Sequence, residues 1–546
     1  MLAIGSSMLH LALCVLYFAV LLGLSAFGLH RLHLVLLCRK NRERIATAQR
    51  AEPLTEDELP TVTIQLPLYN ESTVAVRLVQ AVAKMDYPRE KLEIQVLDDS
   101  TDETAAMTRD EVERLAATGV DVVYIHRTNR AGYKAGALDE GLRVAKGEMV
   151  AIFDADFLPQ PDFVRAIVPH FKDAKVGMVQ TRWGHMNRDV SMLTKVQALM
   201  LDGHHLVENR ARFGSGLLFN FSGTGGMWRK SAIHSAGGWQ HDTLTEDLDL
   251  SYRAQLAGWK FIYREDVVSP SELPEEISAL RAQQYRWGKG TVQTARKLLG
   301  RVLAADIPLA QKIEAVFHMT PHFAYPLLVL LSILILPALV LMPATSTTTM
   351  IIVDLPLCMA TTGSLAAFYM LAESAQGRKR RGALARLPML IAIGTGLAPH
   401  LSVAVWEGFR SMAGEFVRTP KQGNNKNRYK AAIQLPYVET LLALWSAAAV
   451  VASVQTGHYF ATPFAVLFTL GYSLVTVLLV QEQLLRRPAR TVAPVIPAPA
   501  LTVGMVSEEL VHSLTRRDSD MPASGERLVG AELEGEEASG AEAVAA

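Results

Sequence analysis

Three groups of acidic residues stand far apart along the chain, each beside an apolar or helical stretch. They are Asp98-Asp99, Asp154-Ala155-Asp156 and Glu246-Asp247. Carboxylates suit two kinds of chemistry, because they bind hard divalent cations through oxygen and, when ionised, remove a proton from a hydroxyl group. If the fold brings the three groups together, the sequence predicts one site that combines a metal ion with a general base.

The second group, Asp154-Ala155-Asp156, directly follows the apolar run Met149–Phe153. In an extended chain its two carboxylates project to one side, about 7 Å apart along the strand. This spacing suits a divalent cation shared with a diphosphate, and an ordinary polar strand end is the alternative. We expect Asp154 and Asp156 to hold Mg²⁺ or Mn²⁺, which prefer oxygen ligands and neutralise charge on a leaving nucleoside diphosphate.

The third group stands at the predicted start of a helix over Leu248–Leu256. With Thr245 as the N-cap, Asp247 lies in the first turn, where the positive end of the helix favours the ionised carboxylate. Such a carboxylate can take the proton of an acceptor hydroxyl during displacement at an anomeric carbon. A single displacement inverts the configuration, so an α-linked donor gives a β-linked product. Stabilisation of the helix start by Glu246 and Asp247 is the alternative role.

Polar residues at the ends of the first two predicted strands suit a nucleotide. The first strand ends in Pro67-Leu68-Tyr69-Asn70-Glu71 and the second in Asp98-Asp99-Ser100. Neighbouring carboxylates raise each other's pKa, and ribose hydroxyls or base N–H groups would satisfy them. Asp98-Asp99-Ser100 is equally typical of a helix start. The residues expected to bind the donor are Pro67, Tyr69, Glu71, Asp98, Asp99, Lys134 and Asp154.

Cations are predicted at the diphosphate end of the site. Arg130, Lys134 and Gly136 follow the third strand in what reads as a loop, with a cation and flexible backbone suited to a diphosphate. Gln283, Arg286 and Trp287 are spaced i, i+3 and i+4, so on a helix they share one face. Arg binds phosphate at two points, and Trp offers a flat apolar surface to a sugar ring. A surface Arg beside a core Trp is the usual alternative.

The elements that must position these residues alternate between strand and helix. Strands are predicted over 61–66, 93–97, 121–125 and 149–153, and helices over 74–84, 103–116 and 134–145. Such alternation predicts an α/β domain with a mostly parallel sheet and helices on both faces. Ligands bind beyond the carboxyl ends of such strands, which is where the residues above fall.

Long apolar runs flank this segment. Half of the 546 residues are hydrophobic and the formal net charge is zero, which gives no reason to expect nucleic acid as a partner. The runs that are long enough to cross a bilayer are Met8–Gly28, Pro321–Met342, Met350–Glu373, Leu387–Phe409, Pro436–Val454 and Tyr459–Val480.

Basic residues predict how these runs are placed. Arg39 and Lys40 follow the first run, which favours a retained anchor whose C-terminal side is cytoplasmic. Leu387–Phe409 has basic segments on both sides, so we expect an amphipathic interface helix with His400, Glu407 and Arg410 on its polar side. An ordinary membrane span is the alternative. The prediction is five spans, with the N-terminus outside.

The predicted domains are an anchor over 1–38, a catalytic domain over 54–300, interface helices with four spans and a loop over 301–485, and a disordered cytoplasmic tail over 486–546. The sequence therefore predicts an integral protein of the plasma or inner membrane. Its catalytic domain is expected in the cytoplasm.

The ordered motifs carry a family resemblance. Asp98-Asp99, Asp154-Ala155-Asp156, Thr245-Glu246-Asp247 and Gln283-Gln284-Tyr285-Arg286-Trp287 resemble the processive family-two glycosyltransferases, which include cellulose, chitin and hyaluronan synthases. The blocks 219–229 and 236–239 look closest to plant-type cellulose synthase-like enzymes that make mannan or glucan backbones. The resemblance covers roughly 59–290, and the flanking membrane segments extend it to most of the chain.

This resemblance implies a GT-A fold, with Asp247 as the base beside Thr245 and Glu246. It assigns Gln283, Arg286, Trp287, Gly223 and Thr224 to the acceptor and diphosphate end. The segment Phe416-Val417-Arg418-Thr419-Pro420-Lys421 is similar to the mobile gating loop of the family, predicted over about 411–430, although Val is more usual where Arg418 stands.

The resulting expectation is a membrane enzyme that transfers a hexose to a growing β-linked polysaccharide. UDP-glucose is the first candidate donor and GDP-mannose a close second, a glycan is the acceptor, and accessory subunits are candidate partners. Trp183, Trp406 and Trp445 are candidate sugar platforms, although aromatic residues near membrane interfaces are more often anchors. The alternatives are transfer of a single sugar to a lipid and a scaffold without activity.

Overall fold

The computed structural model describes residues 2–48, 51–341, 355–412 and 435–485, with the single positions 348, 352 and 414. The described helices and strands belong to one compact unit, Met1–Arg486. Two predictions fall outside the described residues and stay predictions. They are the gating loop with Phe416, Thr419 and Lys421, and the tail over 486–546.

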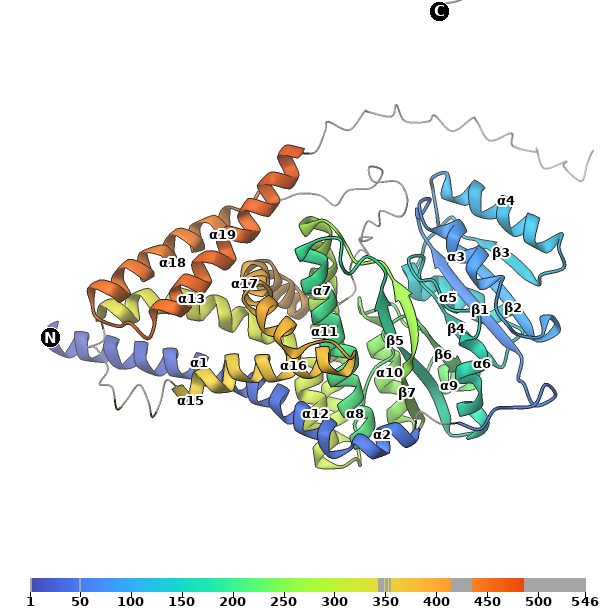
Figure 1. The fold of residues 1–546 in the computed structure, drawn as a ribbon, viewed down its shortest axis with the longest axis horizontal. Helices are drawn as coiled ribbons and strands as arrows, with labels where there is room; N and C mark the ends of the chain where they lie inside the picture. Colours follow the sequence, from blue (N-terminus) through green and yellow to red (C-terminus); the bar gives the residue numbers. More distant parts are fainter. Residues whose placement is uncertain are drawn as a thin grey trace, which may run out of the picture. The chain divides into compact units, whose positions relative to one another are not determined.

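A seven-stranded sheet with the order β3-β2-β1-β4-β6-β5-β7 forms the centre of the catalytic region (Figure 1). Strand β1 pairs in parallel with β2 and β4, and β2 pairs in parallel with β3. Strand β6 is antiparallel to both β4 and β5. The strands are β1 (Val62–Leu68), β2 (Leu92–Asp98), β3 (Val122–His126), β4 (Met149–Ile152), β5 (Val176–His185), β6 (Gly226–Arg229) and β7 (Lys260–Ser271).

The first four strands lie where the sequence predicts them. Nearly every residue of β1 and β4 is buried, as expected for central parallel strands covered on both faces. The antiparallel β6 was not predicted, because its four residues form a run too short to stand out in the sequence. The mostly parallel sheet is therefore confirmed, with one reversed strand in its interior.

Short helices accompany the sheet and correspond to the predicted ones where predictions were made. In chain order they are α3 (Ala75–Val82), α4 (Thr104–Ala116), α5 (Tyr133–Val144), α6 (Phe163–Ile167), α7 (Met192–Gly203), the π-helix His204–Asn209, α8 (Arg210–Ser215), α9 (Lys230–Ser235) and α10 (Glu246–Leu256).

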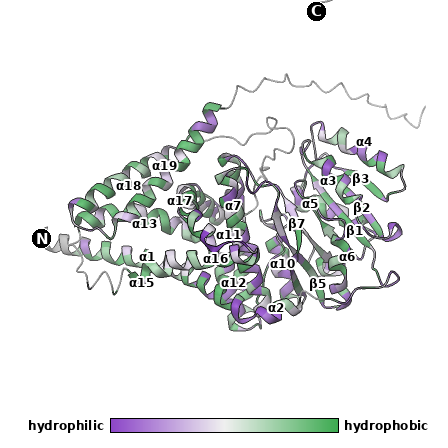
Figure 2. Ribbon diagram, in the orientation of Figure 1, coloured by the Kyte–Doolittle hydropathy of each residue, from purple (hydrophilic) through white to green (hydrophobic). Residues whose placement is uncertain are grey.

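The described residues include six helical stretches that are long and apolar enough to cross a membrane. Figure 2 shows apolar residues covering α1, α13, α18 and α19, in contrast to the mixed surface around the sheet. The helices outside the sheet region are α1 (Leu2–Lys40), α2 (Arg42–Ala48), α11 (Ile277–Ala304), α12 (Leu309–Met319), α13 (Ala324–Leu341), α15 (Leu355–Cys358), α16 (Ser364–Ala375), α17 (Arg380–Arg410), α18 (Tyr437–Gln455) and α19 (Thr462–Leu485).

Helix α17 contains the predicted interface helix and begins seven residues earlier, at Arg380. Figure 1 shows it nearly end-on, whereas α1, α13, α18 and α19 run across the view. Its polar side packs against α11, because Glu407 accepts a hydrogen bond from Lys289 at 2.9 Å and the His400 ring lies 4.8 Å from the Tyr285 ring. Part of the predicted polar side therefore contacts protein, while Arg410 stays exposed.

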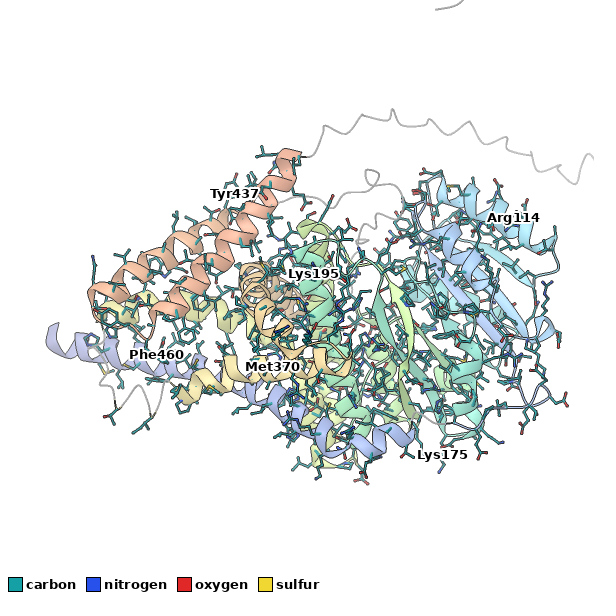
Figure 3. The ribbon with its side chains drawn as sticks, viewed as in Figure 1. Arg114, Lys175, Lys195, Met370, Tyr437 and Phe460 are labelled. Carbon is teal, nitrogen blue, oxygen red and sulfur yellow. The ribbon has the colours of Figure 1, made fainter. Side chains whose placement is uncertain are left out.

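The catalytic region and the long helices share buried contacts. Glu439 of α18 pairs with Arg281 of α11 at 3.1 Å, and Glu482 of α19 accepts a hydrogen bond from the Ser278 backbone at 3.1 Å. Helices α7 and α16, identified in Figure 3 by Lys195 and Met370, also touch. Gly203 allows this approach, since a Cβ there would come within 2.5 Å of the Phe368 ring.

Candidate active site

One cavity beyond the carboxyl ends of β1 and β4 collects most of the predicted site residues. Its walls come from the first strand end, α5, the turn after β4, the start of α10 and the face of α11. The predicted residues that line it are Pro67, Tyr69, Glu71, Asp99, Arg130, Lys134, Asp154, Asp156, Gly223, Thr245, Glu246, Asp247, Gln283, Arg286 and Trp287. At least one carboxylate of each acidic group therefore lines the same cavity, although the three groups are far apart in the sequence.

Asp98 is the exception among the predicted donor residues, and that assignment is wrong in its placement. Its side chain is fully buried and does not line the cavity. The carboxylate accepts hydrogen bonds from the Ser100 backbone at 2.8 Å, from Tyr124 at 2.7 Å and from Thr108 at 3.2 Å. Because a buried carboxylate needs such donors, Asp98 holds β2, β3 and α4 together.

Asp99 does line the cavity, and Arg127 holds it there. The guanidinium donates two hydrogen bonds to the carboxylate, at 2.8 and 2.5 Å. Such a two-point pair fixes the orientation of both side chains. Sequence reasoning missed Arg127, because a single Arg after a strand carries no signal of its partner.

The residues of Asp154-Ala155-Asp156 form a turn, so the predicted extended spacing is wrong. Strand β4 ends at Ile152, and a turn begins at Ala155. Asp154 accepts a hydrogen bond from Lys134 at 2.5 Å, and its backbone N–H donates to Thr224 at 2.9 Å. Both carboxylates still line the cavity, because the turn keeps them at the carboxyl end of the strand.

Thr224 and Gly136 lie behind the cavity wall. Thr224 is buried and positions Asp154 through the hydrogen bond just described, so its predicted place at the diphosphate end is corrected. Gly136 and Lys134 lie within α5, not in a loop. A Cβ at Gly136 would come within 2.0 Å of the Ala131 carbonyl oxygen, so this glycine is required by close packing.

Backbone strain gathers beside the cavity. The non-glycine residues with positive φ among those described are Asn70, Arg130 and Tyr133, at 54°, 44° and 51°. All three flank the ends of β1 or α5, and Arg130 lies over the Tyr69 ring at 3.3 Å from its centroid. Residues persist in this region when their surroundings hold them there, and they cluster at binding sites.

Gly223 brings the backbone against the acidic groups. Its φ is +81°, and an added Cβ would lie 3.1 Å from Asp247 Oδ2 and 3.6 Å from Lys134 Nζ. The Gly223 carbonyl accepts a hydrogen bond from Lys134 at 2.9 Å. Only glycine fits both the conformation and this space.

Thr245 occupies the N-cap position of α10, as predicted, but its side chain caps nothing. The hydroxyl instead lies 3.0 Å from the hydroxyl of Thr294 on α11. The predicted effect on Asp247 is also corrected. Burial, together with the neighbouring Glu246 carboxylate, raises the pKa of Asp247 to about 7, and these two effects outweigh the opposing hydrogen bond from the Leu248 backbone and the charge of Lys134.

Arg286 lies close enough to both the second and the third acidic group to interact with their charges. Burial lowers the pKa of this guanidinium, while Glu246, Asp154, Asp247 and Asp156 all oppose that shift. Gln283, Arg286 and Trp287 lie together on α11, as their spacing predicts. The cavity as a whole is lined by seven carboxylates and three cations, a formal charge of −4.

Residues 60–290 match the family model described as glycosyltransferase like family 2. These residues form a family 2 glycosyltransferase domain. The match and the mixed sheet confirm the predicted family and its GT-A type of fold.

The glycosyltransferase domain also matches curated plant proteins. The chain is 41% identical over 290 residues to glucomannan 4-beta-mannosyltransferase 1 of Oryza sativa subsp. japonica, covering 51% of this chain and 56% of that protein. It is 40% identical over 293 residues to glucomannan 4-beta-mannosyltransferase 7 of Arabidopsis thaliana, covering 52% and 53%. The chain spans about half the length of the curated relatives it matches.

Two solved structures are similar at lower levels. A mannosyltransferase from Pyrobaculum calidifontis in complex with GDP-Man and Mn²⁺ has a TM-score of 0.43 and 22% identity, covering 64% of this chain and 98% of that one. TarS 1-349 of S. aureus in complex with UDP-GlcNAc has a TM-score of 0.33 and 14% identity, covering 64% and 89%.

Some lining residues of the glycosyltransferase domain were not predicted as site residues. Ser222 lines the cavity and lies in the block 219–229 that carries the family resemblance, whereas Leu244 and Glu272 line it without any motif that marks them. Of the three candidate sugar platforms, Trp183 lines this cavity. Trp406 and Trp445 do not, and their side chains are 62% and 42% exposed, as interface anchors are.

The neighbours Asp98 and Asp99 should respond differently to the same substitution. Asp98→Asn should lower the free energy of unfolding by about 1–3 kcal/mol, because the Tyr124 and Thr108 hydroxyls lose a charged acceptor. Asp99→Asn should instead weaken nucleotide binding. Thermal unfolding and nucleotide titration of both variants, with Tyr124→Phe as a second probe of the Asp98 cluster, test this. Normal stability with weak nucleotide binding in Asp98→Asn would contradict the assignment.

Proposed function

We propose that the chain is an inverting glycosyltransferase that adds hexose units from a nucleotide-diphosphate sugar to a growing β-linked polysaccharide. The observation that supports it most is the convergence of Asp154, Asp156, Asp247 and Arg286 on one cavity. This cavity lies in a family 2 domain. Arg286, Asp154 and Asp156 make the end suited to a diphosphate, and Asp247 makes the end suited to a base.

Asp247 is the proposed base. Its carboxylate takes the proton of the acceptor hydroxyl as the hydroxyl oxygen attacks the anomeric carbon and the nucleoside diphosphate leaves. A pKa near 7 suits this role, because the group is ionised often enough to act and basic enough to accept a proton. The single displacement converts an α-linked donor into a β-linked product.

Arg286 and Lys134 are proposed to bind the leaving diphosphate. Lys134 keeps its positive charge, because Asp154, Glu246 and Asp247 raise its pKa more than burial lowers it. Arg127 and Arg77 pair with Asp99 and Glu272 from outside the lining. The other five carboxylates and a diphosphate still outnumber the three lining cations, so the cavity fits an added divalent cation. Asp154 and Asp156 would hold that ion, Mg²⁺ or Mn²⁺, which would neutralise charge on the diphosphate.

A mannosyl donor is favoured over a glucosyl donor. The sequence leaves UDP-glucose and GDP-mannose open, and the curated relatives at 40–43% identity are named glucomannan 4-beta-mannosyltransferases. We therefore propose GDP-mannose as the preferred donor. The six long apolar helices support synthesis at a membrane. Arg39 and Lys40 after the first apolar run favour a cytoplasmic glycosyltransferase domain.

Radiolabelled GDP-mannose and UDP-glucose, incubated with the purified full chain, test the proposal. The expected product is a β-linked polymer from GDP-mannose, and Asp247→Asn should abolish transfer while nucleotide binding stays within about twofold, because the substitution removes the base and keeps its shape. Label found only in a lipid-extractable monoglycoside would contradict polysaccharide synthesis. Unchanged turnover in Asp247→Asn would contradict the assigned base.

The pH dependence of kcat/KM tests the electrostatics of the base. The Glu246 carboxylate disfavours ionisation of Asp247, so Glu246→Gln should lower the pKa of Asp247. Activity needs the ionised form, and the acidic limb of the wild-type profile should therefore move to lower pH in the variant. A limb that stays in place or moves to higher pH would show that another group controls it.

A further inference from the structure

A second cavity continues from the base end of the first. The two cavities share Asp247, Trp287 and Trp183 in their walls. From there the second cavity extends between the π-helix His204–Asn209, α12 and the C-terminal half of α1. It therefore begins where an acceptor hydroxyl must approach the base, and it lies on the side away from the predicted donor residues of β1.

Two polar residues of the π-helix project into this cavity. The Nδ1 of His204 lies 3.0 Å from Glu208 Oε2, and the side chains are 29% and 25% exposed. Burial raises the pKa of Glu208, but the hydrogen bond from His204 and the charge of Arg212 lower it more, so its pKa lies below the ordinary value. Glu208 is thus an ionised acceptor of hydrogen bonds. π-helical turns are rare and occur often at functional sites.

A chain of buried ion pairs holds the Glu208 side chain in place. Arg212 Nη1 lies 3.5 Å from Glu208 Oε2, and Arg212 Nε donates to Glu314 Oε1 at 2.8 Å. Glu314 also pairs with His30 of α1 at 2.8 Å. The Arg212 and Glu314 side chains are only 2% and 4% exposed, whereas His204 and Glu208 remain accessible. The arrangement holds Glu208 in one orientation before any ligand arrives.

The chemistry of the walls favours an uncharged sugar chain. Arg31 and Arg212 balance Glu208 and Asp247 among the lining residues, so the cavity has no formal net charge. Arg212 is already engaged by two carboxylates, which leaves little positive charge for a lipid phosphate. Flat aromatic side chains beside hydrogen-bonding groups suit sugar rings, which have apolar faces and hydroxyl edges. The aromatic residues of the walls are Phe27, Trp183, Trp287 and Phe317.

Two polar atoms in the walls point to a hydroxyl-bearing ligand. Within the part of the chain that the structure describes, Ser222 Oγ and His322 Nδ1 are buried and have no hydrogen-bond partner, and the buried Arg212 Nη1 has only its 3.5 Å ion pair with Glu208. Ser222 and His322 line the second cavity, and Ser222 also lines the first. Buried polar atoms are rarely left without a partner in native proteins, and sugar hydroxyls both donate and accept.

We propose that the second cavity binds the sugar units of the acceptor that lie behind the reacting unit, with Glu208, oriented by His204, accepting hydrogen bonds from their hydroxyl groups. This inference rests on the proposed function and names the acceptor as an uncharged glycan. Glu208 and His204 act on acceptor binding and lie outside the donor cavity.

Initial rates of the purified full chain in nanodiscs test the assignment. A short β-1,4-linked manno-oligosaccharide is varied at saturating GDP-mannose, and the donor is then varied at saturating acceptor. Glu208→Gln and His204→Ala should each raise the KM for the oligosaccharide about tenfold, the effect of losing a hydrogen bond to a charged group. The KM for GDP-mannose should stay unchanged, which also shows that the variants are folded.

His234→Ala is the matched control, because His234 is an exposed residue of α9 that lines neither cavity. An unchanged oligosaccharide KM in Glu208→Gln, with active wild type, would overturn the subsite alone. Transfer from GDP-mannose to a polyprenyl phosphate, lost in Glu208→Gln, would overturn the glycan assignment. A wild type that extends no oligosaccharide from either donor would overturn the proposed function itself.

Discussion

The excess of carboxylates in the donor cavity is the constraint on which the rest of the site depends. Seven acidic and three basic side chains line it, and a nucleoside diphosphate would add more negative charge. Lys134 lies between Asp154 and the Gly223 carbonyl, and Arg286 interacts with four carboxylates at once. Burial, together with the neighbouring Glu246 carboxylate, raises the pKa of Asp247 toward the range where a base works well. The excess of carboxylates thus favours a cation, and burial beside one of them makes Asp247 a stronger base.

Helix α11 connects this electrostatic site to the long apolar helices. Its face carries Gln283, Arg286 and Trp287 into the cavity, and its first turns are held by Glu439 of α18 and Glu482 of α19. The second cavity starts at the same helix and reaches α1. A glycan extended at Asp247 would therefore lie along a path whose walls come from the glycosyltransferase domain and the long helices together.

The sequence predicts most of the donor cavity, because its residues sit at strand ends and on one helical face, where periodicity fixes their direction. It misplaces Asp98 and Thr224, since a motif does not show which of two neighbours turns toward the cavity. The turn at Asp154-Ala155-Asp156 and the raised pKa of Asp247 depend on packing and burial. His204, Glu208 and Arg212 carry no motif at all, and only the fold brings them beside α1 and α12.

Calorimetric titration of the full chain with a nucleoside diphosphate, with and without Mn²⁺ or Mg²⁺, tests the central claim most directly. The account predicts that chelation of the cation weakens binding at least about tenfold, since the diphosphate must otherwise enter a cavity of net negative charge. It also predicts the same loss, with cation present, when Asp154 and Asp156 are both changed to Asn. Equal affinity with and without the cation would contradict a cation site at Asp154 and Asp156 in the donor cavity.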